Sequence, residues 1–153
     1  MNTKTEEMRA RMEEHKTAPR SPLPDLLMVH HLIPSLLSYD EATMTMELAF
    51  DTLPWMANPN GVVHGGIVAS MIDNAMGMVS FIQKEFPNPT VSMNVNYIRP
   101  VPVNTTVVVR TRVLSYGKSS AHITAELFHP DRPDHILLSA TGVYYSLLAN
   151  SKP

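Results

Sequence analysis

One histidine, two glycines and one aspartate are spaced in a way that suits hydrolysis of an acyl compound. His64, Gly65 and Gly66 follow a turn-forming stretch, and Asp73 comes shortly after them in an otherwise apolar run. The first turn of a helix leaves backbone N–H groups without partners, and these groups can hold an oxyanion. A carboxylate in an apolar helix is costly unless it has a partner or a role. The pattern therefore indicates a site for acyl transfer or hydrolysis.

These residues lie where a predicted loop passes into a predicted long helix. Residues 52–61 are rich in turn-forming residues, and residues 64–84 form an apolar helix that ends before Pro87 and Pro89. A hairpin is predicted over Ser35–Phe50, with Asp40 and Glu41 near its turn and a half-buried alternation from Thr43 to Leu48. Further strands are predicted over 91–97, 106–113, 121–127 and 136–148, with turns at 100–102, 116–119 and 130–134.

The order of these elements predicts the fold. A helix that is apolar nearly all round belongs in a core, and a half-polar antiparallel sheet has one apolar face to cover. We therefore predict an α+β protein with the hotdog fold, an antiparallel β-sheet wrapped around one long central helix. Residues 1–34 are predicted as a charged helix over 3–16 followed by a Pro-rich linker from Thr17, and residues 35–150 as one domain.

Composition narrows the chemistry. The chain has 153 residues, a formal net charge of −2 and no cysteine, which excludes a thiol nucleophile, a disulfide framework and a cysteine zinc site. The histidines lack metal-ligand spacing, so no metal or other cofactor is expected. Near-neutral charge and the lack of an uninterrupted membrane-length apolar stretch predict no nucleic-acid or membrane partner, and a charged N-terminus favours a cytoplasmic location.

Helical geometry separates the two halves of the predicted site. His64 and Asp73 are nine residues apart, which corresponds to about 900° of rotation and about 13.5 Å of rise in a helix. If the helix start and Asp73 cooperate, they must come from different subunits. A stripe of small and polar residues is predicted to face a partner helix in an isologous dimer. The stripe consists of Ser70, Asp73, Asn74, Gly77 and Ser80.

The segment 58–77 resembles the hotdog-fold thioesterases of the phenylacetate-degradation type, which hydrolyse acyl-coenzyme A thioesters. Their motif has Asn, five residues, His-Gly-Gly, six residues and Asp, and it is matched by Asn58, His64, Gly65, Gly66 and Asp73. The resemblance extends to residues 91–100 and 116–119 and covers about residues 35–148. It implies an acyl-CoA thioesterase that forms a homodimer, or a tetramer built as a dimer of dimers.

The resemblance also implies roles for single residues. The Gly65 backbone N–H would hold the oxyanion, and Asp73 would act as general base or as nucleophile. Asn58 would position the carbonyl or the water, His64 would hold the loop or contact the thioester, and Thr90 would orient the water. Contacts to substrate or coenzyme A are predicted for Gly66, Asn74, Arg99 and Lys118.

Structural interpretations stand beside each of these roles. Asp73 could be satisfied by neighbouring groups, His64 could cap the helix, Asn58 could simply form a turn, and the glycines could serve close packing. Arg99, Arg110, Arg112 and Lys118 could be solvated charges on the polar face of the sheet. Two other functions are a non-catalytic acyl-ligand-binding hotdog protein and a hotdog enoyl-CoA hydratase. A serine hydrolase is disfavoured because the chain has no Gly-x-Ser-x-Gly elbow.

Overall fold

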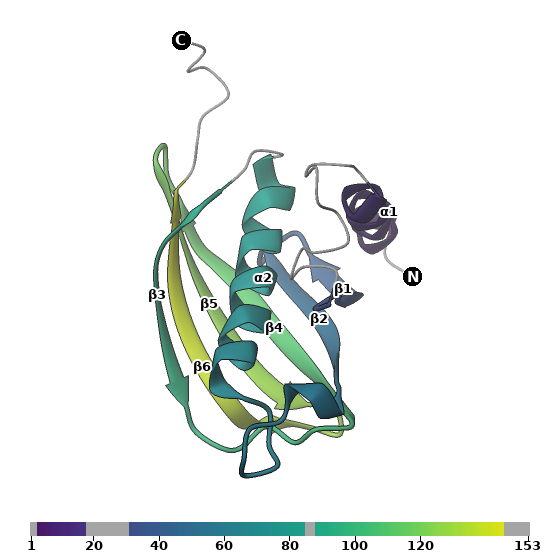
Figure 1. The fold of residues 1–153 in the computed structure, drawn as a ribbon. Coiled ribbons are helices and arrows are strands. Elements are labelled where there is room, and N and C mark those ends of the chain that lie inside the picture. The colour runs from purple at the N-terminus through teal and green to yellow at the C-terminus, as the bar shows by residue number, and fades with distance from the viewer. Residues whose placement is uncertain (1–2, 18–30, 85–87, 146–153) are drawn as a thin grey trace.

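A six-stranded antiparallel sheet curves around one long helix in the computed structural model (Figure 1). The structure describes residues 3–17, 31–84 and 88–145. The elements are α1 (Thr3–Thr17), β1 (Ser35–Asp40), β2 (Thr45–Thr52), the 3-10 helix η3 (Pro54–Met56), α2 (Gly65–Lys84), β3 (Thr90–Tyr97), β4 (Thr105–Tyr116), β5 (Ser120–His129) and β6 (Arg132–Tyr145). The prediction of an α+β hotdog arrangement is confirmed.

The strand order in the sheet is β1-β2-β4-β5-β6-β3, and every pair of neighbours is antiparallel. The chain enters α2 after the β1–β2 hairpin and returns as β3 at the far edge of the sheet. β4 then pairs with β2, so β3 and β1 form the two edges. This topology places the end of α2 close to the start of β3.

The core lies between α2 and the concave face of the sheet. Met71, Ile72 and Met76 of α2 have no exposed surface, and the strands supply the facing apolar side chains, among them Met46, Leu48, Val107, Val109, Ile123, Leu127 and Leu138. By length and composition alone, Gly65–Ile82 reaches the mean hydropathy of a membrane-spanning helix, at 1.3. The stretch contains Asp73, so it is not an uninterrupted apolar run. The packing of α2 against the sheet accounts for its apolar character.

Two strands start two or more residues away from their predicted first residues. β2 begins at Thr45, not Thr43, because Met44 adopts a left-handed φ of 50° in the hairpin turn. Asp40 shapes this turn by accepting hydrogen bonds from the Ala42 N–H and the Thr43 hydroxyl, and the Thr43 bond chiefly lowers the pKa of Asp40. β6 starts at Arg132, within the predicted turn at 130–134. The predicted end of that strand at 146–148 lies outside the described residues, as does most of the predicted linker.

Helix α1 lies beside the edge strand β1 (Figure 1). Its Met8 and Met12 side chains are buried in the core cluster. The Thr5 hydroxyl donates to the Tyr39 carbonyl oxygen and accepts from the Tyr39 N–H, both at 3.3 Å. The otherwise open backbone edge of β1 is thus satisfied at this position by a side chain of α1.

Candidate active site

His64 caps the start of α2. Its carbonyl oxygen accepts hydrogen bonds from the N–H groups of Ile67 and Val68, at 2.9 and 3.1 Å. Its ring Nδ1 accepts a bond of 3.0 Å from the Gly66 N–H, so Nδ1 carries no proton in this arrangement. A Cβ at position 66 would lie 3.2 Å from Nδ1, so glycine at this position leaves room for the His64 ring. The Gly66 N–H is therefore already engaged.

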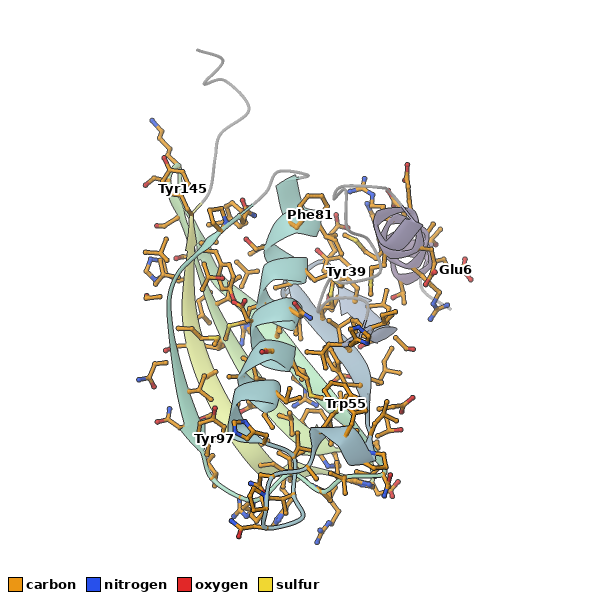
Figure 2. The ribbon with its side chains drawn as sticks, viewed as in Figure 1. Glu6, Tyr39, Trp55, Phe81, Tyr97 and Tyr145 are labelled. Atoms are coloured by element: carbon orange, nitrogen blue, oxygen red, sulfur yellow. The ribbon has the colours of Figure 1, made fainter. Side chains whose placement is uncertain are left out.

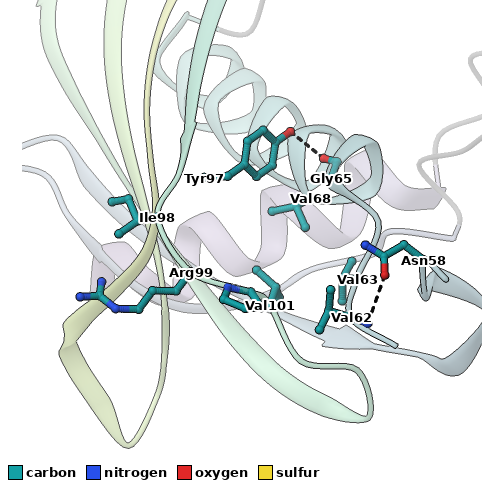
Figure 3. Close-up of a pocket in the computed structure, with 10 residues that line it drawn as sticks. Asn58, Val62, Val63, Gly65, Val68, Tyr97, Ile98, Arg99 and Val101 are labelled. Atoms are coloured by element: carbon teal, nitrogen blue, oxygen red, sulfur yellow. Dashed lines mark hydrogen bonds between the residues drawn. The ribbon is translucent and has the colours of Figure 1, made fainter. Parts of the chain in front are cut away.

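Gly65 offers the open donor at this helix start. Within the described chain, no acceptor receives its N–H. Its carbonyl oxygen, by contrast, accepts a 2.8 Å hydrogen bond from the Tyr97 hydroxyl at the end of β3 (Figure 3). A Cβ at position 65 would lie 3.4 Å from the Tyr97 ring, so the tyrosine is seated directly against the glycine.

Asn58 organises the loop that leads to this helix start. Its Oδ1 accepts hydrogen bonds from the N–H groups of Asn60 and Val62, at 2.9 and 3.4 Å. Gly61 completes the turn with a φ of +77°, a conformation that glycine adopts without strain. The His64 N–H then bonds to the Met56 carbonyl oxygen at 2.8 Å. The turn interpretation of Asn58 is thus realised, and its side-chain Nδ2 remains available on the pocket side (Figure 3).

A pocket of about 310 Å³ opens in front of the Gly65 N–H region. Asn58, Gly65 and Arg99, all predicted site residues, line it together. The remaining lining is mainly apolar: Val62, Val63, Val68, Tyr97, Ile98, Pro100 and Val101. A guanidinium N–H of Arg99 also donates to the Ile136 carbonyl oxygen, so Arg99 has a structural contact in addition to its place at the pocket.

Asp73 lies two turns further along α2 and is partly buried. Its Oδ1 accepts hydrogen bonds from the Thr90 hydroxyl at 2.7 Å and from the Tyr144 hydroxyl at 2.9 Å. Burial raises the pKa of Tyr144, and the neighbouring Asp73 carboxylate raises it further, so the phenol stays protonated as a donor. The structure thus brings the predicted pair Asp73 and Thr90 into direct contact.

A buried polar network holds the segment that carries Thr90. Asn88 donates to the Ser80 hydroxyl at 2.7 Å and to the Tyr116 hydroxyl at 3.1 Å, and Tyr116 donates to the Ser80 carbonyl oxygen. These bonds fasten the chain just before β3 to the last turns of α2. These bonds thereby keep the Thr90 hydroxyl within hydrogen-bond distance of the Asp73 carboxylate.

Three other residues of the predicted site and dimer stripe lie outside the two groups around Gly65 and Asp73. Ser80 has no exposed surface within its own chain, so it does not belong to a stripe that faces a partner, and that part of the stripe prediction is wrong. Asn74 is partly buried, and its Nδ2 is a buried donor without a partner in the described chain. Lys118 lies in the β4–β5 turn, far from the pocket.

The separation of Arg99 and Lys118 follows from strand register. The Arg99 N–H bonds to the Leu137 carbonyl oxygen, whereas Ser120, next to the Lys118 turn, pairs with Tyr145. Eight residues of β6 separate these two levels, which corresponds to about 26 Å. Figure 2 shows the same separation between Tyr97 and Tyr145, which mark opposite ends of the sheet.

Tyr97 and Tyr144 are the residues that the sequence interpretation missed as site residues. Tyr97 belonged to the segment 91–100 and was interpreted only as one of the alternating apolar positions of a strand. Tyr144 sat in the most apolar strand, where an aromatic residue is ordinary core. Among residues 3–17, 31–84 and 88–145, no group of three or more His, Asp or Glu side chains could hold a metal ion.

Comparison with known proteins identifies the class and then the family. The solved structure of the Escherichia coli PaaI protein from the phenylacetic acid degradation operon superposes with a TM-score of 0.75, at 15% identity, over 95% of this chain and 96% of that one. By fold this chain is a hotdog protein. Residues 60–134 match the model of the thioesterase superfamily. The chain belongs to that superfamily.

Two further similarities concern coenzyme A. Human acyl-coenzyme A thioesterase 13 is 31% identical over 71 residues, which are 46% of this chain and 51% of the human protein. The match thus spans about half the length of this curated relative. A Streptococcus mutans protein whose structure was solved with bound acetyl-CoA superposes with a TM-score of 0.66, at 17% identity, over 73% of this chain and 86% of that one.

Proposed function

We propose that this protein hydrolyses acyl-CoA thioesters to a free acid and coenzyme A. The observation that carries the proposal is the position of the Asp73 carboxylate, which accepts hydrogen bonds from two hydroxyl groups. Asp73 lies on α2, and the first residue of the same helix, Gly65, has a backbone N–H without an acceptor in the described chain. A fixed carboxylate and an oxyanion donor are the two groups that thioester hydrolysis requires, because the thiolate is already a good leaving group. The names of the relatives support the same reaction.

Gly65 and Asp73 divide the reaction between them. The Gly65 N–H would bind the thioester oxygen as it becomes an oxyanion, a type of contact that supplies about 2.7–4 kcal/mol in other enzymes. Asp73 would take a proton from water as the water oxygen bonds to the carbonyl carbon, or would itself bond to that carbon and form a mixed anhydride that water then opens. In both routes the C–S bond breaks and coenzyme A leaves as a thiolate that takes up a proton.

We further propose that each site combines two subunits. Gly65 and Asp73 are eight residues apart on one helix, which is about 12 Å of rise. Edge strand β3 leaves Val91 63% exposed and Tyr97 56% exposed, although the Tyr97 hydroxyl bonds to Gly65 at the start of α2. Antiparallel pairing of two β3 edges would cover both side chains and place the Asp73 of one subunit near the Gly65 of the other. The unpaired Asn74 Nδ2 donor favours a partner beside Asp73.

A panel of acyl-CoA thioesters with detection of the released thiol tests the reaction. Asp73→Asn should lower kcat by at least about 100-fold, in the range expected for loss of a general base. Asp51→Asn is the matched control, because the Asp51 Oδ1 also accepts a threonine hydroxyl, that of Thr106, at 2.6 Å but lies at the surface. Equal activity of Asp73→Asn and wild type would refute the proposal, and ligand binding without turnover would favour the non-catalytic alternative.

A substitution at Gly65 isolates the oxyanion donor. Gly65→Pro removes the N–H at the first helical position, where proline is well tolerated, and Gly65→Ala retains the N–H while adding a similar Cβ. Activity should therefore fall much further in Gly65→Pro than in Gly65→Ala. Mixing Asp73→Ala chains with Gly65→Pro chains should restore part of the activity, since one site of each hybrid dimer has both intact halves. No recovery after verified chain exchange would argue against shared sites.

A further inference from the structure

The Tyr144 hydroxyl and the Thr90 hydroxyl bond to the same oxygen of Asp73. The two residues are direct cross-strand partners on β6 and β3, so their side chains leave the sheet side by side and meet α2 at one point. Both hydrogen bonds end on Oδ1, at 2.9 and 2.7 Å. Within the described chain, Oδ2 receives no hydrogen bond. One oxygen of the carboxylate is thus fixed and the other is left for chemistry.

Two glycines make room for the Tyr144 ring. A Cβ at Gly142, two residues earlier on the same face of β6, would lie 2.9 Å from the ring and 2.9 Å from the Met76 sulfur. A Cβ at Gly77 on α2 would lie 3.8 Å from the ring on its other edge. Tyr144 is only 1% exposed, so the ring has a single seat between strand and helix. Its hydroxyl therefore cannot turn to water and remains directed at Asp73.

We propose that Tyr144 is a positioning residue for Asp73, which directs Oδ2 at the reacting water or thioester carbon by holding Oδ1. The inference rests on the proposed hydrolysis. A neutral phenol suits this positioning role better than a cationic side chain, because it orients the carboxylate without neutralising its negative charge. The hydrogen bond also favours the ionised form of the carboxylate.

No other charged group competes for this role among the described side chains. Between Gly65 and Ile82, α2 has no ionisable residue besides Asp73, and Tyr116 of β4 is engaged with Ser80. Tyr97 lies at the other end of β3 and bonds to Gly65. Most charged and histidine residues of β2, β4 and β5 alternate with buried positions and so lie on the opposite face of the sheet: Glu47, Asp51, Arg110, Arg112, His122 and Glu126. His129, at the end of β5, pairs with Arg132 at the start of β6, far from Tyr144.

Tyr144→Phe tests the proposal, because it removes the hydroxyl and keeps the ring in its seat. We expect kcat to fall about tenfold with KM nearly unchanged, because Tyr144 contacts Asp73 and not the bound substrate. Tyr145→Phe is the matched control, since Tyr145 is the neighbouring tyrosine, is 44% exposed and points away from α2. A merely structural role would lower stability without this selective decrease in kcat.

A second measurement is independent of turnover. The carboxyl carbon of Asp73 can be observed by NMR in protein labelled at its six aspartates, with the signal assigned through Asp73→Asn. Because the Tyr144 hydroxyl bonds directly to Oδ1, the chemical shift of this carbon should change in Tyr144→Phe and stay at its wild-type value in Tyr145→Phe. An unchanged chemical shift together with kcat within twofold of wild type would overturn the inference. If Asp73→Asn were fully active, the proposed function would fail, while the chemical shift would still decide whether Tyr144 holds the carboxylate.

Discussion

Tyr97 and His64 hold the same peptide group from its two ends. The Tyr97 hydroxyl donates to the Gly65 carbonyl oxygen at 2.8 Å, and the His64 Nδ1 accepts from the Gly66 N–H at 3.0 Å. The peptide between Gly65 and Gly66 is therefore fixed, and the preceding peptide, which carries the open Gly65 N–H, is fixed with it. Preorganised donors of this kind cost no reorganisation when charge develops.

Tyr97→Phe should weaken this arrangement without removing the donor. Loss of one hydrogen bond of about 0.5–1.5 kcal/mol corresponds to a decrease of about 2- to 10-fold in kcat/KM. The decrease should appear mainly in kcat, because the proposed contact of the Gly65 N–H would be stronger with the oxyanion than with the ground-state carbonyl. Steady-state kinetics on the best thioester of the panel measures it. A change confined to KM would instead assign Tyr97 to substrate binding.

His64→Ala should act chiefly on stability. It removes the acceptor for the Gly66 N–H at the start of α2, and loss of such a cap costs about 0.5–2 kcal/mol of the free energy of unfolding. Urea denaturation followed by circular dichroism measures the effect, with His122→Ala, an exposed position on β5, as control. A full loss of activity in a stably folded His64→Ala protein would show that the ring has a chemical role beyond capping.

The sequence pattern predicted the elements in which one face is buried and the other is exposed, and the apolar helix that they cover. Alternation with period two marked β3, β4 and β5 because their side chains point alternately to α2 and to the opposite face. The apolar run from Gly65 fixed α2 to within one residue of its observed start. Met44 was assigned to a strand because an isolated apolar residue before a strand gives no sign of a left-handed turn.

The contact between Tyr144 and Asp73 could not be predicted, since it depends on register. Periodicity shows which face of β6 carries Tyr144, but the pairing of Thr90 with Tyr144 joins positions 54 residues apart in the chain. A one-residue shift of either strand would send one of these side chains to the other face. The loop motif with Gly65 was accessible because its residues are adjacent in sequence.

Lys118 and Arg99 should behave differently when each is replaced by alanine. If the two-subunit site is correct, the Lys118 turn of one subunit lies at the pocket end of the other. Lys118→Ala should then raise KM for coenzyme A esters about two- to fivefold, as expected for an exposed ion pair, with kcat nearly unchanged. Added salt should partly reproduce the effect, and a thioester truncated before the nucleotide should not respond.

Arg99→Ala should raise KM in the same way and also lower stability, because its guanidinium holds the Ile136 carbonyl oxygen. Arg112→Ala, an exposed arginine on the opposite face of the sheet, is the control for general charge effects. Equal losses on full-length and truncated thioesters would mean that Lys118 and Arg99 do not contact the nucleotide part of the substrate.

Thr5→Val should detach helix α1 from the sheet edge. Thr5 is 6% exposed, and its hydroxyl is both donor and acceptor for the backbone of Tyr39, so valine of nearly the same shape removes both of these hydrogen bonds. We expect a loss of about 1–3 kcal/mol in the free energy of unfolding, at about 0.5–1.5 kcal/mol for each hydrogen bond. Thr5→Ser, which retains the hydroxyl, should lose much less stability, and Thr3→Val at an exposed position of α1 should change stability little.

The same Thr5→Val variant should keep its activity, because β1 lies at the edge of the sheet opposite β3, and kcat on the best thioester should stay within about twofold of wild type. The uncovered β1 edge should promote self-association, which light scattering detects. A stable, monodisperse Thr5→Val protein would show that the buried methionines of α1 alone hold the helix in place.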